Sequence, residues 1–230
     1  MCGRFVITSP PAALRQIFGY LDQPNFPPRY NIAPTQPIPV VIIENGIKHF
    51  RLMRWGLLPA WVTDPRKFTL LINARAETVL EKPAFKNAVK RRRCLILADG
   101  YFEWKAETPK KKQPFYFHLK DDAPFAFAGI WDPAAEDLPA AYCILTSAPN
   151  ELVSRVHDRM PVILTADAMV RWIGDRPLSD EEFRLLVSPI ASERMASRPV
   201  SRFVSNSRNE GPGCLAPPDD APPEPELDFT

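Results

Sequence analysis

The fold is decided by one stretch, which reads Cys94-Leu95-Ile96-Leu97-Ala98-Asp99-Gly100-Tyr101-Phe102-Glu103-Trp104-Lys105. The continuous apolar run over 94–98 predicts a buried strand, and the pair Asp99-Gly100 predicts a turn. Residues 101–105 then predict a second strand rich in aromatic side chains. Two strands joined without a helix indicate a sheet whose neighbouring strands run antiparallel.

Side chains alternate between the two faces of the strand over 101–105. Phe102 and Trp104 share one face, which we expect to meet the core. Glu103 shares the opposite face with Tyr101 and Lys105. A carboxyl held between two large aromatic residues is partly desolvated, which raises its pKa toward that of a general acid or base. The alternative is an ordinary solvent-facing glutamate.

Outward from this stretch, strands outnumber helices and mostly follow one another directly. Predicted strands cover 4–8, 40–43, 47–55, 114–120, 125–131, 141–146 and 199–204, and predicted helices cover 12–18, 84–93, 149–156, 166–173 and 179–187. Asn45-Gly46 is a strong hairpin signal, and Ser9 before two prolines is a good helix start. The pattern favours the α+β class, with an antiparallel or barrel-like sheet core and short flanking helices.

Charge divides the 230-residue chain into two parts. Residues 1–208 hold 29 basic and 21 acidic side chains, a net charge of +8, whereas residues 209–230 hold six acidic side chains and no basic one. We expect one domain over 2–208 and a disordered, acidic, proline-rich tail over 209–230. A basic body suits a polyanionic partner such as nucleic acid, or is simply a solvated surface.

The cysteines and histidines are scattered. The four cysteines lie at 2, 94, 143 and 214 and the three histidines at 49, 118 and 157, which is not the spacing of a zinc site or a disulfide framework. We therefore expect no metal and no cofactor. No apolar run is long enough for a membrane span, and no signal peptide precedes the first strand. We expect an intracellular monomer, cytoplasmic and nucleoid-associated if the source is bacterial.

Cys2 carries the most distinctive chemistry. Loss of Met1 would place an α-amine and a thiol on the same residue, and such an aminothiol captures an aldehyde as an imine and then as a thiazolidine ring. An α-amine with a pKa of 7.7–8.0 is roughly a tenth deprotonated at pH 7, far more than a lysine. The alternative is a buried cysteine that only begins a core strand.

Proton transfers and polar contacts must accompany imine formation. Asn73 and Arg75 would share one face of an extended segment, where the amide could orient the terminus and Arg75 could bind a phosphate. The alternative is a turn asparagine beside a surface arginine. His157 lies between a predicted helix and a predicted strand, where it could transfer protons or simply end the helix.

Seven ordered segments carry a resemblance to a known family. They are Met1-Cys2-Gly3-Arg4-Phe5, Arg29-Tyr30-Asn31-Ile32-Ala33-Pro34, Trp55-Gly56-Leu57-Leu58-Pro59-Ala60-Trp61, Asn73-Ala74-Arg75-Ala76-Glu77-Thr78, the stretch over 94–105, His157-Asp158-Arg159-Met160-Pro161 and Val204-Ser205-Asn206. Together they resemble the SRAP (SOS-response-associated peptidase) family from residue 2 to about residue 213. The resemblance implies a protein that recognises abasic sites in single-stranded DNA and joins itself to them.

The resemblance also implies roles for individual residues. Met1 is removed by the protein itself, which explains the word peptidase, and Cys2 forms a thiazolidine with the ring-opened deoxyribose. Asn73 places the terminus and sugar, Glu103 acts as acid and base, and His157 protonates the sugar oxygen. An AP-lyase activity, by β-elimination from the Schiff base, is implied as well.

Six further residues match positions that contact DNA in the family. These are Arg4, Pro34, Trp61, Arg75, Thr146 and Arg159. Arg4 and Arg75 correspond to phosphate contacts, and Pro34 and Trp61 to a loop pair near the flanking bases. Some relatives carry a second aromatic residue where this chain has Val62, so base stacking is expected to be weaker here.

Two other functions fit part of the sequence. A glutamine amidotransferase of the N-terminal-nucleophile class would also expose Cys2 after loss of Met1 and use its own amine as the base. A module that binds damaged DNA without a covalent bond would need Cys2 only for structure.

Overall fold

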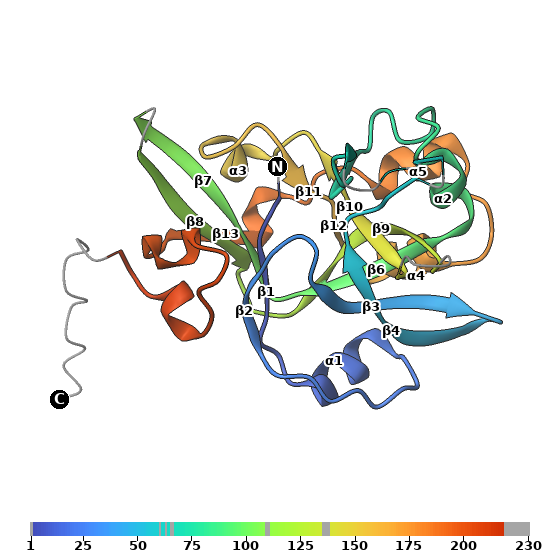
Figure 1. Cartoon of the computed structure of the whole chain (residues 1–230), viewed down its shortest axis with the longest axis horizontal. Coiled ribbons are helices and arrows are strands. Elements are labelled where there is room, and N and C mark those ends of the chain that lie inside the picture. The colour runs from blue at the N-terminus through green and yellow to red at the C-terminus, as the bar shows by residue number, and fades with distance from the viewer. Residues whose placement is uncertain are drawn as a thin grey trace.

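The stretch from 94 to 105 divides between two sheets. This holds in a computed structural model that describes residues 2–59, 61–62, 64, 67–108, 111–134 and 139–218 (Figure 1). Strand β6 (Arg93–Ala98) belongs to one sheet and β7 (Gly100–Thr108) to the other. Asp99 is therefore the residue at which the chain crosses, which confirms the predicted turn and gives it a larger role.

The carboxylate of Asp99 fixes this crossing. It accepts hydrogen bonds from the backbone N–H of Thr8 at 2.5 Å and of Ser9 at 2.8 Å, and from the Ser9 hydroxyl at 2.5 Å. Ser9 is thus engaged by Asp99, and Pro10 occupies the N-cap of the first helix without a side-chain cap. The helix prediction is confirmed, but the capping role expected of Ser9 is wrong.

The first sheet has five antiparallel strands. In spatial order they are β13 (Met195–Pro199), β8 (Lys111–Leu119), β7, β1 (Phe5–Ile7) and β2 (Arg29–Ile32). The predicted strand over 199–204 is wrong, since the strand ends at Pro199 and a 3-10 helix, η3 (Arg202–Ser205), follows. The hairpin of β7 and β8 projects from one side of the molecule (Figure 1).

The second sheet has eight strands and is nearly closed. Its remaining members are β11 (Met160–Pro161), β10 (Ala141–Ser147), β4 (Ile47–Trp55), β3 (Pro37–Glu44), β9 (Phe125–Asp132), β12 (Ile163–Leu164) and β5 (Asn73–Arg75). Because β10 pairs with both β4 and β9, five strands form an irregular ring. Pairing of β10 with β4 and β5 is parallel, whereas the other strand pairs of this sheet are antiparallel, as in the expected antiparallel or barrel-like core.

Short helices surround the sheets. They are α1 (Pro11–Phe18), α2 (Lys86–Arg91), α3 (Glu151–Ser154), α4 (Ala166–Ile173), α5 (Asp180–Leu186) and the 3-10 helices η2 (Ser192–Arg194) and η4 (Pro212–Leu215). The α+β class is therefore confirmed. Among the described residues, every helix is too short or too polar to serve as a membrane span.

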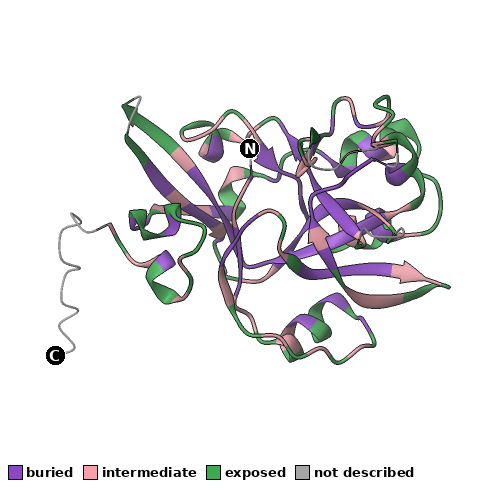
Figure 2. Ribbon diagram, viewed as in Figure 1, coloured by how far each residue is buried: buried purple, intermediate pink, exposed green. Residues whose placement is uncertain are grey.

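Two apolar clusters bury opposite faces of β7. Tyr101 and its neighbours belong to the large central cluster, whereas Phe102 packs in a smaller cluster with Val6, Val204 and Cys214. Buried residues occupy the centre of both sheets, while residues 105–108 of β7 and 111–112 of β8 are exposed (Figure 2). The face of Glu103 therefore meets the main core, which corrects the orientation predicted for Phe102.

The face of β7 that carries Phe102 is covered by a segment predicted to be disordered. Cys214 is fully buried, the Ser201 N–H donates to the Ala216 carbonyl at 2.8 Å, and Arg198 donates to the Leu215 carbonyl at 2.8 Å. The segment 209–218 thus packs against the smaller apolar cluster through Cys214 and Leu215. Its mostly polar and proline-rich composition does not indicate this contact. The rest of the predicted tail, 219–230, lies outside the described residues.

Gly100 allows β7 to begin where it does. A Cβ at this position would overlap the ring of Tyr116, whose hydroxyl donates to the Asp99 carbonyl at 3.2 Å. We expect Gly100→Ala to lower the free energy of unfolding by about 1–3 kcal/mol, because the buried ring must move. Urea denaturation measures this. Gly174→Ala is the control, since its Cβ would meet nothing closer than the Val170 carbonyl at 3.5 Å; equal losses in both variants would contradict the explanation.

Candidate active site

Cys2 lies at the start of the N-terminal strand and is completely buried. The side-chain amide of Asn73 donates to the Cys2 carbonyl at 2.9 Å, which ties the terminus to β5. Burial raises the pKa of the Cys2 thiol well above its ordinary value, and the nearby Glu103 carboxylate raises it further. The thiol is therefore protonated at neutral pH. Met1 lies outside the described residues.

Glu103 is only 2% exposed, so the solvent-facing alternative is wrong. It reaches the interior from β7, on the face that also carries Tyr101. Burial raises the pKa of Glu103 to about 7. Near neutral pH this carboxyl exists in both protonation states, which suits a residue that must give and take protons.

His157 faces Glu103 from the segment between α3 and β11. Its Nε2 lies 3.8 Å from Oε2 of Glu103, and the backbone N–H of Arg159 donates to its Nδ1 at 3.0 Å. Burial lowers the pKa of His157, so the ring is mostly neutral at pH 7. Nδ1 also lies 3.2 Å from the Arg159 carbonyl and 3.0 Å from a carboxylate oxygen of Asp158, so either ring nitrogen has a partner that suits it as a proton donor.

The helix before His157 is fixed by Asn150. Its side chain accepts from the Val153 N–H at 2.9 Å as an N-cap and donates to the Ile190 carbonyl at 2.9 Å. Asn150 therefore fixes the N-terminus of α3 and ties it to the distant segment that contains Ile190. His157 follows directly, and its own N–H donates to the Val153 carbonyl at 2.9 Å.

Asn73 is placed by the parallel pairing of β5 with β10, in which Ile144 is its partner. The amide nitrogen of Asn73 donates to the Cys2 carbonyl. The amide oxygen, Oδ1, is buried and has no hydrogen-bond partner among the described residues. A buried acceptor of this kind calls for a ligand or water, because an unsatisfied polar atom is costly.

Direct contacts or electrostatic effects thus link the four residues predicted to be catalytic. Cys2 comes from the N-terminus, Asn73 from β5, Glu103 from β7 and His157 from the segment between α3 and β11. They supply a thiol, an amide, a carboxyl whose pKa burial raises to about 7 and an imidazole whose pKa burial lowers. Within the described residues no group of His, Cys, Asp and Glu side chains has the arrangement of a metal site. The site is built for nucleophilic and acid-base chemistry by organic groups.

Predicted DNA contacts near His157 divide into exposed and buried residues. Arg75 is exposed on β5, opposite Thr146 of β10. Thr146 is fully buried, and its hydroxyl accepts from Arg159 at 3.2 Å. Arg159 is held by both oxygens of Glu77, at 2.6 and 2.8 Å, and donates to the Thr146 carbonyl at 2.6 Å.

The remaining predicted contacts lie on other loops. Trp61 is 57% exposed, which leaves its ring open for stacking. Pro34 is partly exposed and precedes Thr35, a turn residue with a φ of 76°. Arg4 is half-buried and donates to the side chain of Asn31 at 2.9 Å.

Sequence reasoning missed the residues that support these groups. Tyr101 and Tyr142 are fully buried, their hydroxyls lack partners among the described residues, and in each case the Cys2 thiol adds to burial in raising the pKa. Glu77 and Asn31 were visible only as members of matched motifs. Their tertiary partners, Arg159 and Arg4, could not be read from spacing.

A model of the SOS response associated peptidase (SRAP) family matches residues 1–207. The chain belongs to the SRAP family. This match confirms the resemblance that the seven segments predicted. It includes the described residues of this SRAP member up to 207 and leaves out 208–218.

Relatives of this SRAP member include bacterial and vertebrate proteins. The abasic site processing protein YoqW of Bacillus subtilis is 37% identical over 94% of this chain and 99% of its own length. The abasic site processing protein HMCES of Xenopus tropicalis is 30% identical over 94% of this chain and 78% of its own length. A crystal structure of a Bacteroides thetaiotaomicron protein superposes with a TM-score of 0.81 at 26% identity, covering 94% of this chain and 99% of that one.

Proposed function

We propose that this protein processes abasic sites in single-stranded DNA by forming a covalent bond through Cys2 after removal of Met1. The observation that carries the proposal is that buried Glu103, whose pKa is raised to about 7, interacts both with the Cys2 thiol and with His157, whose Nε2 lies 3.8 Å from its carboxylate. The names of the relatives support abasic sites as the substrate class.

The chemistry begins at the freed α-amine of Cys2. As the sugar ring opens, the protonated form of His157 gives a proton to the ring oxygen and the Glu103 carboxylate takes the proton of the anomeric hydroxyl, and the lone pair of the amine then attacks the aldehyde carbon. Loss of one water from the carbinolamine gives an imine, with Glu103 supplying the proton that leaves with the hydroxyl.

Ring closure then uses the thiol. The Cys2 sulfur adds to the carbon of the protonated imine, Glu103 takes up the thiol proton, and the nitrogen keeps the hydrogen that it already carries, so that the net change is the loss of one water. The raised pKa of the thiol fits this order, because the amine reacts while the sulfur is still protonated. If β-elimination removes the 3′ phosphate before closure, the same imine leads to strand cleavage.

The same observation disfavours an amidotransferase. Such an enzyme needs a reactive thiolate, whereas burial and a neighbouring carboxylate raise the pKa of Cys2. The basic body and the exposed Trp61 suit a DNA substrate better. Non-covalent binding of damaged DNA stays as the second candidate, and the adduct assay separates it from the proposal.

The proposal is tested with single-stranded DNA that holds one abasic site. Protein whose Met1 has been lost, verified by mass, is expected to give an adduct that survives heat and detergent and weighs one water less than its parts. A form with residues added before Met1 should bind the DNA and give no adduct. An equal yield from the extended form would refute the role of the free amine.

A further inference from the structure

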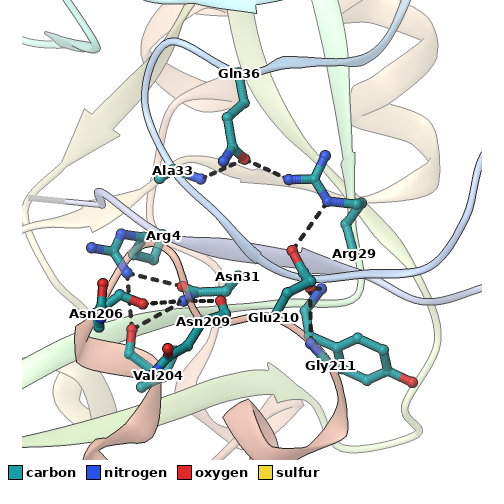
Figure 3. Close-up of polar contacts among 11 residues, drawn as sticks. Arg4, Arg29, Asn31, Ala33, Gln36, Val204, Asn206, Asn209, Glu210 and Gly211 are labelled. Carbon is teal, nitrogen blue, oxygen red and sulfur yellow. Dashed lines mark hydrogen bonds and ion pairs between the residues drawn. The ribbon is translucent and has the colours of Figure 1, made fainter.

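Asn31 is a fully buried polar residue that joins two distant parts of the chain. It is 1% exposed, on β2, and its side-chain amide donates to the carbonyls of Val204 at 3.2 Å, Asn206 at 3.0 Å and Asn209 at 2.8 Å (Figure 3). One amide therefore holds the whole turn that follows η3. Such a concentration of bonds on one buried side chain fixes the backbone of that segment.

The other end of the same side chain holds Arg4. Asn31 Oδ1 accepts from Nη1 of Arg4 at 2.9 Å, and the Val204 carbonyl accepts from the same nitrogen at 2.9 Å (Figure 3). Both protons of Nη1 are thereby used. The guanidinium also lies 5.8 Å from the centre of the Trp104 ring.

The arrangement leaves the outer edge of the Arg4 guanidinium for an external partner. Among the residues that the structure describes, Nη2 has only a long, exposed contact, at 3.5 Å, with the Ser205 carbonyl. The surface beside it is polar and basic, since Ser205, Ser207 and Arg208 are all exposed. Trp104 is anchored to this surface by its Nε1, which donates to the Ser205 hydroxyl at 3.0 Å.

We propose that Asn31 is a positioning residue, which holds Arg4 and the segment 202–209 together as a preformed site for a DNA phosphate beside the abasic sugar. The proposal rests on the proposed function. Arg4 is two residues from Cys2, so its backbone lies within about 7 Å of that of the reacting terminus. A guanidinium fixed in advance loses less side-chain entropy on binding than a free one, which strengthens each bond it makes.

The test compares Asn31→Ala with Gln113→Ala. Gln113 is also buried and donates to the Val200 carbonyl at 2.7 Å, so it anchors the same part of the chain without touching Arg4. Asn31→Ala is expected to weaken binding of abasic single-stranded DNA by about tenfold, as loss of a charge-assisted bond does. The slope of log affinity against log salt should fall by about 0.7, one phosphate contact. Gln113→Ala should change neither quantity at temperatures where both variants are folded.

Two further measurements separate positioning from a purely structural role. In an Arg4→Ala background, Asn31→Ala should cost no further affinity, because the residue it acts through is gone. The rate of thiazolidine formation with free 2-deoxyribose, which has no phosphate, should equal that of the wild type. If Asn31→Ala does not fold, Asn31→Ser, which is shorter and removes the amide that holds Arg4 but keeps a hydroxyl for the buried carbonyls, is expected to show the same coupling.

Additive losses with Arg4→Ala, or equal losses in the Asn31 and Gln113 variants, would overturn the positioning role. These outcomes are distinct from failure of the proposed function. If the wild-type protein formed no adduct, the covalent chemistry would be refuted, whereas the coupling between Asn31 and Arg4 in DNA affinity would still be measured.

Discussion

Replacement of Cys2 by alanine is expected to abolish the heat-stable adduct with abasic single-stranded DNA while leaving DNA binding intact. The α-amine is retained, so an imine still forms, but no sulfur can close the ring. The imine hydrolyses reversibly, and it should be seen only when a borohydride reagent reduces it. Denaturing gels with and without reductant, together with binding measured by fluorescence anisotropy, check both parts of this result.

Cys214→Ala is the matched control for Cys2→Ala. Both cysteines are fully buried, but Cys214 belongs to the smaller apolar cluster on the other face of β7. It should form the adduct at the wild-type rate. A stable adduct from Cys2→Ala without reductant would refute the thiazolidine, and loss of the adduct in Cys214→Ala would show that general destabilisation explains both variants.

Glu103→Gln is expected to make the protein more stable and less reactive. Burial raises the pKa of Glu103 from 4.5 to about 7, so the folded state keeps a proton that the unfolded state releases. Stability therefore falls as pH rises from about 4.5 to about 7, and the full cost is present above pH 7. Removing the titrating group should add about 1–3 kcal/mol to the free energy of unfolding at pH 8.

The direction of the change in stability distinguishes a desolvated Glu103 carboxylate from one whose hydrogen bonds are satisfied. Urea denaturation at pH 5 and pH 8 should show a gain for Glu103→Gln that is large at pH 8 and small at pH 5. Adduct formation should slow by about 10²–10⁴-fold, the usual contribution of a general acid or base. A variant that is less stable than the wild type at pH 8 would show that the Glu103 carboxylate is well satisfied and has an ordinary pKa.

Glu151→Gln is a suitable control for Glu103→Gln. Glu151 is 76% exposed in an ion pair with Arg155, and it lies on α3, the helix before His157. Its loss should change stability little, since exposed ion pairs contribute little. The rate of adduct formation should stay at the wild-type value.

Local elements were largely predictable, because periodicity and turn residues act over a few positions. The helix predicted over 166–173 is observed as Ala166–Ile173, and the Asn45-Gly46 hairpin joins β3 and β4 with positive φ angles of 52° and 77°. The failures are non-local. Nothing in the pattern around 141–146 indicates that β10 runs parallel to β5, since pairing direction depends on a long connection.

The sequence by itself determined most of the longer strands and helices, the aminothiol at Cys2 and the ordered motifs that mark the SRAP family. Only the tertiary structure decided that Glu103 is buried, that His157 faces it across 3.8 Å, and that residues 209–218 are packed. The physical reason is that the pKa and exposure of a side chain depend on which distant segments cover it. Such segments are brought together by burial of apolar surface, which residue spacing along the chain does not encode.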